Sequence, residues 1–276
     1  MQYIKATFQT SSQEVCDILI ATLSDIGYEG FEENGEELYA YISEATFDKE
    51  LLENSITMPG VTYHVEIIPP QNWNALWESN FQPVIVDGFC TIRAHFHEIE
   101  IDTPYEIVIT PKMSFGTGHH ATTQLMMSQM RDINFSMKSV LDFGTGTGIL
   151  AILAEMLGSK DLLAIDNDVW SVENALENIG RNNCREIEVI KGSIENIEGK
   201  YRFDIILANI NRHILLNHMK NLFDGINTNR LLLMSGLLSD DKEIILNATE
   251  KQGFELIKLT EQNGWISILF RRKNVI

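Results

Sequence analysis

The sequence is poor in cysteine and has no long apolar run. Its three cysteines, Cys16, Cys90 and Cys184, lie far apart and form no CxxC pair. This usage indicates neither a disulfide framework nor a zinc cluster, and it fits reduced thiols in a cytosol. No apolar stretch approaches the roughly 18 residues of a membrane-spanning helix, and the first eight residues lack the apolar segment of a signal peptide. We therefore expect a cytoplasmic protein with no membrane association.

Basic side chains are also scarce. Lysine and arginine number 21 against 39 aspartates and glutamates, which gives a formal net charge of −18. Nucleic-acid binding depends on a basic surface, so no direct binding to nucleic acid is expected. An acidic surface can instead attract a basic protein, although the same charge also serves solubility alone. Charge by itself leaves both interpretations open.

The first 68 residues predict a small α+β domain. Alternating residues indicate strands, and apolar residues at helical spacing after two serines indicate a helix. The expected elements, in chain order, are a strand at 1–8, a helix at 11–26, strands at 28–33 and 37–43, a helix at 47–56 and a strand at 61–68. This βαββαβ order is the ferredoxin-like arrangement.

A proline pair marks the end of this domain. Pro69 and Pro70 restrict the backbone and cannot donate to a β-ladder, and a short helix is expected at 71–80. Trp73 and Trp77 lie on one face of that helix, which favours domain packing over a ligand cage. The predicted parts of the chain are an N-terminal domain at 1–68, a linker with a helix at 69–86 and a larger domain at 87–276.

Beyond residue 111, strands alternate with helices. The expected strands lie at 139–143, 162–165, 186–190, 203–209 and 231–235, and a closing antiparallel hairpin lies at 254–270. Such alternation is typical of α/β proteins, in which helices cover a parallel, Rossmann-like sheet. Ligands of this fold class bind at the carboxyl ends of the strands.

The sharpest motif follows the first of these strands. Asp142 precedes Gly144, Gly146 and Gly148, and a helix is predicted to begin at Ile149. Glycines permit a tight turn that approaches a ligand closely, and a helix start presents backbone amides to it. A dinucleotide fingerprint, GxGxxG, demands a small residue where Ile149 stands. The spacing GxGxG after an acidic residue is instead the pattern of S-adenosylmethionine (SAM) binding, which places Asp142 near the cationic part of the cofactor.

Three further segments bear on the same site. Asp166 ends the next predicted strand, where a carboxylate accepts hydrogen bonds from ribose hydroxyls. Asn209 ends the fourth strand, although an ordinary turn would also use asparagine. The Gly/Thr-rich loop at 114–123 enters a helix and is either a lid over a ligand or a flexible connection with a threonine cap. Of its adjacent histidines, His119 and His120, at most one is expected to face the site.

Together these segments closely resemble the ribosomal protein L11 methyltransferase (PrmA) family. The resemblance is carried by the Phe-Gly-Thr-Gly run at 115–118 with the threonine pair at 122–123, by 142–152, by Asp166 and by 208–210. It implies a seven-stranded class I SAM methyltransferase domain preceded by a small substrate-recognition domain. It also implies methyl transfer from SAM to the α-amino group and lysine ε-amino groups of the large-subunit ribosomal protein L11, a basic protein. The implied cofactor contacts are Phe115, Thr123, Asp142, Gly144, Gly146, Gly148, Asp166 and Asn209.

The chain departs from the family pattern in two places. His119 and Ala121 stand where the family loop usually has threonine and proline, and Asn211 and Arg212 follow Asn-Ile where small residues are common. These departures bear on the shape of the loop and on access to the site.

The expected reaction is displacement of the sulfonium methyl group by a neutral amine nitrogen. No dedicated base is evident, so the catalytic residue stays open: His120 is one candidate acceptor for the proton of the amine, and solvent is the other. No cluster of metal ligands is evident, so no metal is expected. We expect a monomer. Two alternatives stay open: a SAM-dependent methyltransferase acting on a small amine or another protein, and a noncatalytic SAM-binding module of ribosome assembly. Ile149 disfavours a nicotinamide dehydrogenase.

Overall fold

The computed structural model describes residues 3–10, 12–35, 37–56, 58, 60–68, 81–112 and 114–274. The chain divides into two compact units, residues 1–80 and 81–276. The linker helix expected around Trp73 and Trp77 lies outside the described residues. The domain limits at 1–68, 69–86 and 87–276 stay predictions.

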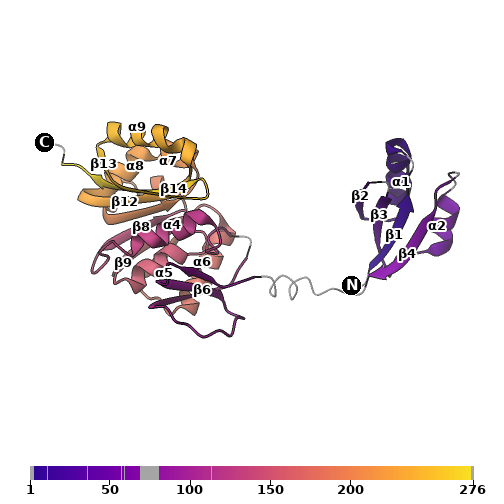
Figure 1. Ribbon diagram of the computed structural model, residues 1–276, viewed down its shortest axis with the longest axis horizontal. Coiled ribbons are helices and arrows are strands. Elements are labelled where there is room, and N and C mark those ends of the chain that lie inside the picture. Colours follow the sequence, from indigo (N-terminus) through magenta and orange to yellow (C-terminus); the bar gives the residue numbers. More distant parts are fainter. Residues whose placement is uncertain are drawn as a thin grey trace. The chain divides into compact units, whose positions relative to one another are not determined.

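The N-terminal unit has the expected ferredoxin-like order (Figure 1). Its elements are β1 (Tyr3–Gln9), α1 (Gln13–Asp25), β2 (Gly30–Asn34), β3 (Glu37–Ser43), α2 (Lys49–Ser55) and β4 (Tyr63–Ile68). The sheet order is β2-β3-β1-β4, and every neighbouring pair is antiparallel. Helix α1 begins where Ser12 accepts a hydrogen bond from the amide of Val15, which confirms the predicted serine cap.

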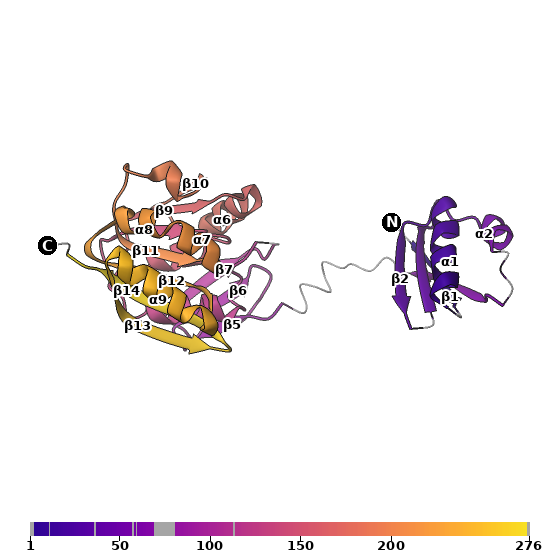
Figure 2. The same ribbon diagram turned by 90° about the horizontal axis from the view of Figure 1, so that it is seen from above.

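The alternation of β1 and β3 decides which face of this sheet is covered. Ile4, Ala6 and Phe8 of β1 pack into one core with the alternate residues of β3, with α1 and with Leu52 of α2. Both helices therefore lie on the same face of the sheet, and Figure 2 shows α1 lying across it.

The second unit opens with a small sheet of β5 (Val84–Val86), β6 (Cys90–Ala94) and β7 (Tyr105–Ile109). Strand β5 runs antiparallel to β6, and β6 runs parallel to β7. The chain then enters α4 (Ala121–Met130), which leads into the large sheet. None of the described helices is long and apolar enough to span a membrane.

The large sheet has seven strands in the order β10-β9-β8-β11-β12-β14-β13. Its strands are β8 (Ser139–Phe143), β9 (Asp161–Asp166), β10 (Ile187–Lys191), β11 (Phe203–Asn209), β12 (Ile226–Leu238), β13 (Phe254–Gln262) and β14 (Trp265–Arg272). The first five are parallel, whereas β14 runs antiparallel to both neighbours. The predicted α/β fold class with a closing hairpin is thus confirmed.

Helices cover both faces of this sheet (Figure 1). They are α5 (Ile149–Met156) and α6 (Val169–Arg181), with α4, on one face, and α7 (Arg212–Asn217), α8 (Met219–Gly225) and α9 (Lys242–Gln252) on the other. After β8 the strand order turns back on itself, because β9 lies on one side of β8 and β11 on the other. Loops diverge at such a point and leave a crevice at the carboxyl ends of the strands.

Candidate active site

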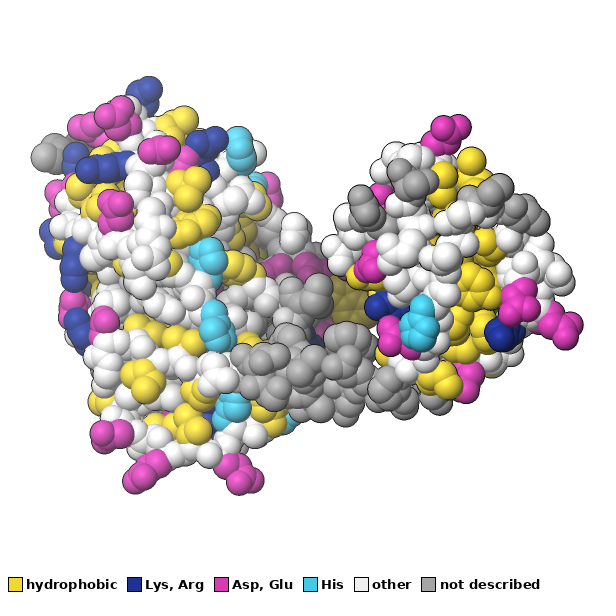
Figure 3. Space-filling model, turned by 45° about the vertical axis from the view of Figure 1, so that its right-hand side comes forward, with side chains coloured by type: hydrophobic (Ala, Val, Ile, Leu, Met, Phe, Trp, Pro, Cys, Tyr) yellow, Lys and Arg dark blue, Asp and Glu magenta, His cyan; other side chains and the backbone are white. Residues whose placement is uncertain are grey.

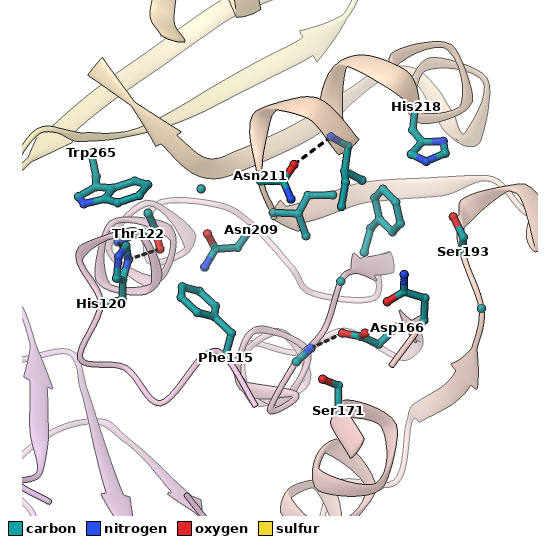
Figure 4. A pocket seen from close by; sticks show the side chains of 18 residues that line it. Phe115, His120, Thr122, Asp166, Ser171, Ser193, Asn209, Asn211, His218 and Trp265 are labelled. Carbon is teal, nitrogen blue, oxygen red and sulfur yellow. Dashed lines mark hydrogen bonds between the residues drawn. The ribbon is translucent and has the colours of Figure 1, made fainter. Parts of the chain in front are cut away.

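A cavity of about 530 Å³ lies at the carboxyl ends of β8, β9 and β11. It brings together six of the nine predicted site residues: Phe115, His120, Gly144, Gly146, Asp166 and Asn209. Phe115, His120 and Trp265 lie at one end, Asp166, Ser193 and His218 lie at the other, and Asn209 lies between them (Figure 4). The other three predicted residues, Thr123, Asp142 and Gly148, do not line the cavity.

The glycine loop shapes the cavity wall. All five backbone amides of residues 144–148 donate hydrogen bonds within the protein, to the backbone oxygens of Phe115, Thr145 and Ile165 and to the carboxylate of Asp166. Gly146 has a φ of 56°, and a Cβ there would lie 2.4 Å from the carbonyl oxygen of Phe115. Glycine is therefore required at this position because the 115–118 loop presses directly against it.

Gly148 serves packing instead. It begins α5 in the left-handed conformation, and a Cβ on it would lie 3.3 Å from the Cβ of Ala175 in α6. The third glycine of the motif thus lets two helices approach each other, and the predicted contact between Gly148 and the cofactor stays a prediction.

Asp166 ends β9 with both carboxylate oxygens oriented by the backbone. Oδ2 accepts a hydrogen bond from the amide of Gly146 at 2.9 Å, and Oδ1 accepts one from the amide of Asp168 at 3.0 Å. Each carboxylate oxygen has about two acceptor positions, so one on each remains for a ligand. The contact of Asp166 with the ribose hydroxyls of the cofactor stays a prediction.

Asn209 lines the cavity and carries an unpaired amide oxygen. Its Nδ2 donates to Thr123 Oγ1 at 3.4 Å, whereas its Oδ1 is buried and has no hydrogen-bond partner among the described residues. A buried carbonyl left unpaired costs about 1–3 kcal/mol, which a ligand donor would recover. Thr123 is fully buried and reaches the cavity only through Asn209, while its neighbour Thr122 lines it. The direct cofactor contact expected of Thr123 stays a prediction.

Asp142 lies beneath the loop. Its side chain is buried, and Oδ2 accepts a hydrogen bond from Thr145 Oγ1 at 2.7 Å. Burial raises the pKa of Asp142 to about 7, against the opposing effect of the Thr145 hydrogen bond, and the negative Asp166 adds a smaller increase. Burial therefore favours the neutral form of this carboxyl.

The two adjacent histidines diverge, as expected. His119 turns away from the cavity, and its Nε2 lies 2.9 Å from the carbonyl oxygen of Gln82. His120 lines the cavity and caps α4, because its Nδ1 accepts a hydrogen bond from the amide of Thr122 at 3.3 Å. The same Nδ1 also lies 2.8 Å from Thr122 Oγ1, a hydroxyl that can donate or accept. In the tautomer that caps the helix, a proton accepted by His120 would go to Nδ1 and would break the cap. The role of His120 as a base stays a prediction.

The two departures at 211 and 212 differ in their relation to the cavity. The guanidinium of Arg212 pairs with the carboxylate of Asp241 at the start of α9 and does not line the cavity. Asn211 does line it, and its Oδ1 accepts a hydrogen bond from the amide of Ile214 and so caps α7. Arg212 is thus held by an ion pair and Asn211 by its hydrogen bond to α7.

Several lining residues were missed from the sequence. They include Phe143, Asn167, Ser193, His218 and Trp265. Ser193 lies two residues after the end of β10, so its place after a parallel strand was an available signal. Trp265 had none, because only the pairing of β14 with β12 brings its ring to 4.6 Å from the ring centre of His120.

Comparison with known proteins indicates one family. The family model described as "Ribosomal protein L11 methyltransferase (PrmA)" matches residues 11–273. A ribosomal protein L11 methyltransferase of Bacteroides thetaiotaomicron is 42% identical, over 98% of this chain and 99% of its own. One of Chlorobaculum tepidum is 36% identical, over 99% and 97%.

Solved structures show the same fold. The crystal structure of a ribosomal protein L11 methylase from Lactobacillus delbrueckii subsp. bulgaricus has a TM-score of 0.64 at 29% identity and covers 70% of this chain and 100% of its own. A methyltransferase from Pyrococcus furiosus has a TM-score of 0.50 at 20% identity and covers 60% and 89%. At that identity the second likeness concerns the fold alone.

Proposed function

Because this chain belongs to the ribosomal protein L11 methyltransferase (PrmA) family, we propose that it methylates the N-terminal α-amino group and lysine ε-amino groups of ribosomal protein L11. The chain is a SAM-dependent methyltransferase. The observation that carries the proposal is the extent of the match, which includes the N-terminal unit as well as the cavity. A family defined by SAM binding alone would share only the second unit.

The cavity fits SAM in size and chemistry. Ligand pockets are commonly about 300–1,000 Å³, and the volume of about 530 Å³ lies within that range. Asp166 would hold the ribose hydroxyls, and the unpaired Oδ1 of Asn209 would accept a hydrogen bond from an amine of the cofactor or substrate. When bound, SAM supplies a methyl group activated on a sulfonium.

The residues at the opposite end would orient the incoming amine. The rings of Phe115 and Trp265 flank His120, with ring centres 5.3 and 4.6 Å from it, and form an aromatic wall. Holding the nitrogen in line with the methyl group can contribute roughly 7–11 kcal/mol. The amine must be neutral to react, and an α-amine with an unperturbed pKa near ~8 loses its proton more readily than a lysine near ~10.4. Removal of the amine from water inside the cavity favours the neutral form of either.

Mass spectrometry of ribosomal proteins incubated with the purified chain and isotope-labelled SAM tests the proposal. Label in L11, located by fragmentation at the α-amino group and at lysines, is the expected result. Label in another protein or in a small amine supports the rival methyltransferase. SAM binding without any transfer supports the noncatalytic module. The variant Asp166→Ala serves as the control for cofactor-dependent labelling.

We also propose that the enzyme is a cytoplasmic monomer and does not bind nucleic acid directly. The overall acidic charge supports the last point, because phosphate groups repel an acidic surface. Sedimentation equilibrium tests the monomeric state, and an electrophoretic shift assay with RNA tests nucleic-acid binding.

A further inference from the structure

Three asparagines follow one face of α6 at intervals of four residues. They are Asn174, Asn178 and Asn182, the last of which is the C-cap of the helix. Residues four apart lie above one another on a helix, so the three side-chain amides form a line. This line faces β7, which is an edge strand of the small sheet.

Two of these asparagines pair with backbone groups on the free edge of β7. Asn182 bonds Val108 twice: its Oδ1 accepts a hydrogen bond from the Val108 amide at 2.9 Å, and its Nδ2 donates to the Val108 carbonyl at 2.7 Å. The Nδ2 of Asn174 donates to the carbonyl of Thr110, directly after β7, at 3.0 Å. An uncovered strand edge can pair with another chain, so covering it is a structural role that needs no ligand.

Asn178 instead divides its amide between β7 and the glycine loop. Its Oδ1 accepts a hydrogen bond from the Thr110 amide at 2.7 Å, and its Nδ2 donates to the carbonyl of Thr147 at 2.8 Å. A backbone amide can only donate and a carbonyl can only accept, so these partners fix the orientation of the side chain. Asn178 is fully buried, where a hydrogen bond is stronger than in water.

Thr147 extends this connection to the segment that carries Phe115. Its amide donates to the Phe115 carbonyl at 3.0 Å, and its buried hydroxyl donates to the Gly116 carbonyl at 2.6 Å. A Cβ on Gly116 would lie 2.8 Å from that hydroxyl, so the two loops are in direct contact. The chain is thus anchored at Thr110 and again at Phe115 and Gly116, and both anchors lead to Asn178.

These backbone anchors decide where the Phe115 ring lies. Phe115 lines the cavity and is 52% exposed, so side-chain packing alone constrains it weakly. Its neighbour across the cavity wall is His120, with ring centres 5.3 Å apart. A shift of the Phe115 backbone would therefore move the ring relative to the cavity.

Partly exposed charges also link α6 to this part of the chain. Glu177 pairs with Lys112 at 2.7 Å and with Arg181 at 2.9 Å. Figure 3 shows basic side chains lying among acidic ones on the surface of the second unit. Ion pairs at a surface contribute little, because water and salt screen them. The buried bonds of Asn178 and Thr147 are therefore the stronger constraint.

We propose that Asn178 and Thr147 are positioning residues for the reaction: they join α6 and the glycine loop to the segment of Phe115 and so hold its ring at the cavity. The inference takes up the predicted contact between Phe115 and SAM. It does not depend on which amine is methylated, so it goes beyond the proposed function and is tested separately from it.

Titration calorimetry with SAM, thermal unfolding and hydrogen exchange test the proposal on the full chain. Asn178→Ala removes the connection to Thr147. Asn182→Ala is the matched control, because it removes the same side chain from the same line and the same strand edge but leaves the glycine loop untouched. Hydrogen exchange followed by mass spectrometry reports the Thr147 amide, which is bonded to Phe115.

Both asparagine variants should unfold at a lower temperature than the wild type, because each leaves backbone groups unpaired. Only Asn178→Ala should speed exchange at the Thr147 amide and raise the Kd for SAM, by about tenfold; Asn182→Ala should change the Kd less than about twofold. Equal increases of the Kd in the two variants would show general destabilisation and would overturn the inference.

Thr147 provides a second test that does not depend on how well Asn178→Ala folds. Thr147→Val removes the hydroxyl bond to Gly116 and should also raise the Kd for SAM about tenfold. Thr147→Ser keeps the hydroxyl and should restore most of the wild-type affinity. A wild-type Kd in Thr147→Val would contradict the proposed role of this residue.

A double-mutant cycle shows whether Asn178 acts through Phe115. Phe115→Ala should itself raise the Kd for SAM about tenfold, and adding Asn178→Ala should raise it less than about twofold further. Additive effects would mean that Asn178 acts on the glycine loop independently of Phe115, and a wild-type Kd in Phe115→Ala would mean that the ring has no part in binding. Either result would overturn the inference and would leave the proposed methylation of L11 intact.

Discussion

The Oδ2 atom of Asp166 accepts a hydrogen bond from the backbone amide of Gly146 across 2.9 Å. This bond joins the end of β9 to the glycine loop after β8, so the two sequence motifs hold each other in position. The carboxylate is thereby oriented toward the cavity before a ligand arrives, and little reorganisation is needed on binding.

Asp166→Ala should lower SAM affinity by about 10–100-fold, because it removes both acceptors for the ribose and the anchor of Gly146. The matched control is Asp168→Ala. Asp168 caps α6 through the amides of Trp170 and Ser171 and does not line the cavity. The Asp168→Ala variant should lose about 1 kcal/mol of stability and keep the SAM affinity of the wild type. Calorimetric titration with SAM gives the Kd of both variants. Equal Kd values for Asp166→Ala and wild type would refute the ribose assignment.

Gly146→Ala should destabilise the protein and weaken SAM binding together. Its Cβ would collide with the carbonyl of Phe115 and displace the 115–118 loop. Gly199→Ala isolates the backbone cost, because Gly199 also has a positive φ, of 72°, but has open space around it. That cost is about 1–2 kcal/mol. Chemical denaturation should show a clearly larger loss at Gly146, and similar losses at the two sites would mean that the loops do not press together.

Asn209→Ala should separate stability from function. It removes a buried carbonyl without a partner among the described residues, so the free energy of unfolding should not fall below the wild-type value by more than about 1 kcal/mol. Methyl transfer should fall at least about tenfold, because the acceptor offered to the ligand is gone. Thr123→Val removes only the 3.4 Å contact behind Asn209 and should have a smaller effect. Undiminished kcat and KM in Asn209→Ala would show that its Oδ1 has no role.

His120→Asn should leave the pH midpoint of kcat unchanged, because asparagine also caps a helix and protonation of the capping nitrogen would cost the cap. His120→Ala loses the cap and should lose about 1 kcal/mol of stability. Rate measurements across neutral and mildly alkaline pH test this expectation. Loss of an ionisation step in His120→Asn would instead assign the base to His120.

The buried carboxyl of Asp142 should make stability depend on pH. Its pKa is about 7 in the folded protein, against an ordinary value of 3.8 when the chain is unfolded, so the folded state binds more protons between these values. Stability from this group is therefore full below about pH 4 and is lost as the pH rises through about 7. Asp142→Asn should be more stable than wild type at about pH 8, by up to about 4 kcal/mol, and the difference should vanish near about pH 4. Denaturation curves across this range measure it, and a constant difference would contradict the raised pKa.

The sequence by itself determined the fold class and the cofactor motif. Each of these signals lies within a short stretch of the chain. They are the alternation of β1, the cap at Ser12, the glycines at 144–148 and the acid at the end of β9. Periodicity, capping and positive φ act within a few residues, so they can be read from a single chain. Sequence motifs predicted Gly144, Gly146, Asp166 and Asn209, which line the cavity, and one of the two adjacent histidines, whereas Phe115 was implied by the resemblance to the family.

Only the tertiary structure decided the rest of the site. It brings Trp265 to His120, turns Arg212 toward Asp241, and leaves Asn209 with an unpaired oxygen beside the cavity, as judged over the described residues. It also buries Asp142 and leaves one face of the N-terminal sheet without helices. Each of these depends on which distant strands pair and on the direction that each side chain takes after packing. No local pattern encodes that information, because it arises from contacts between elements far apart in the chain.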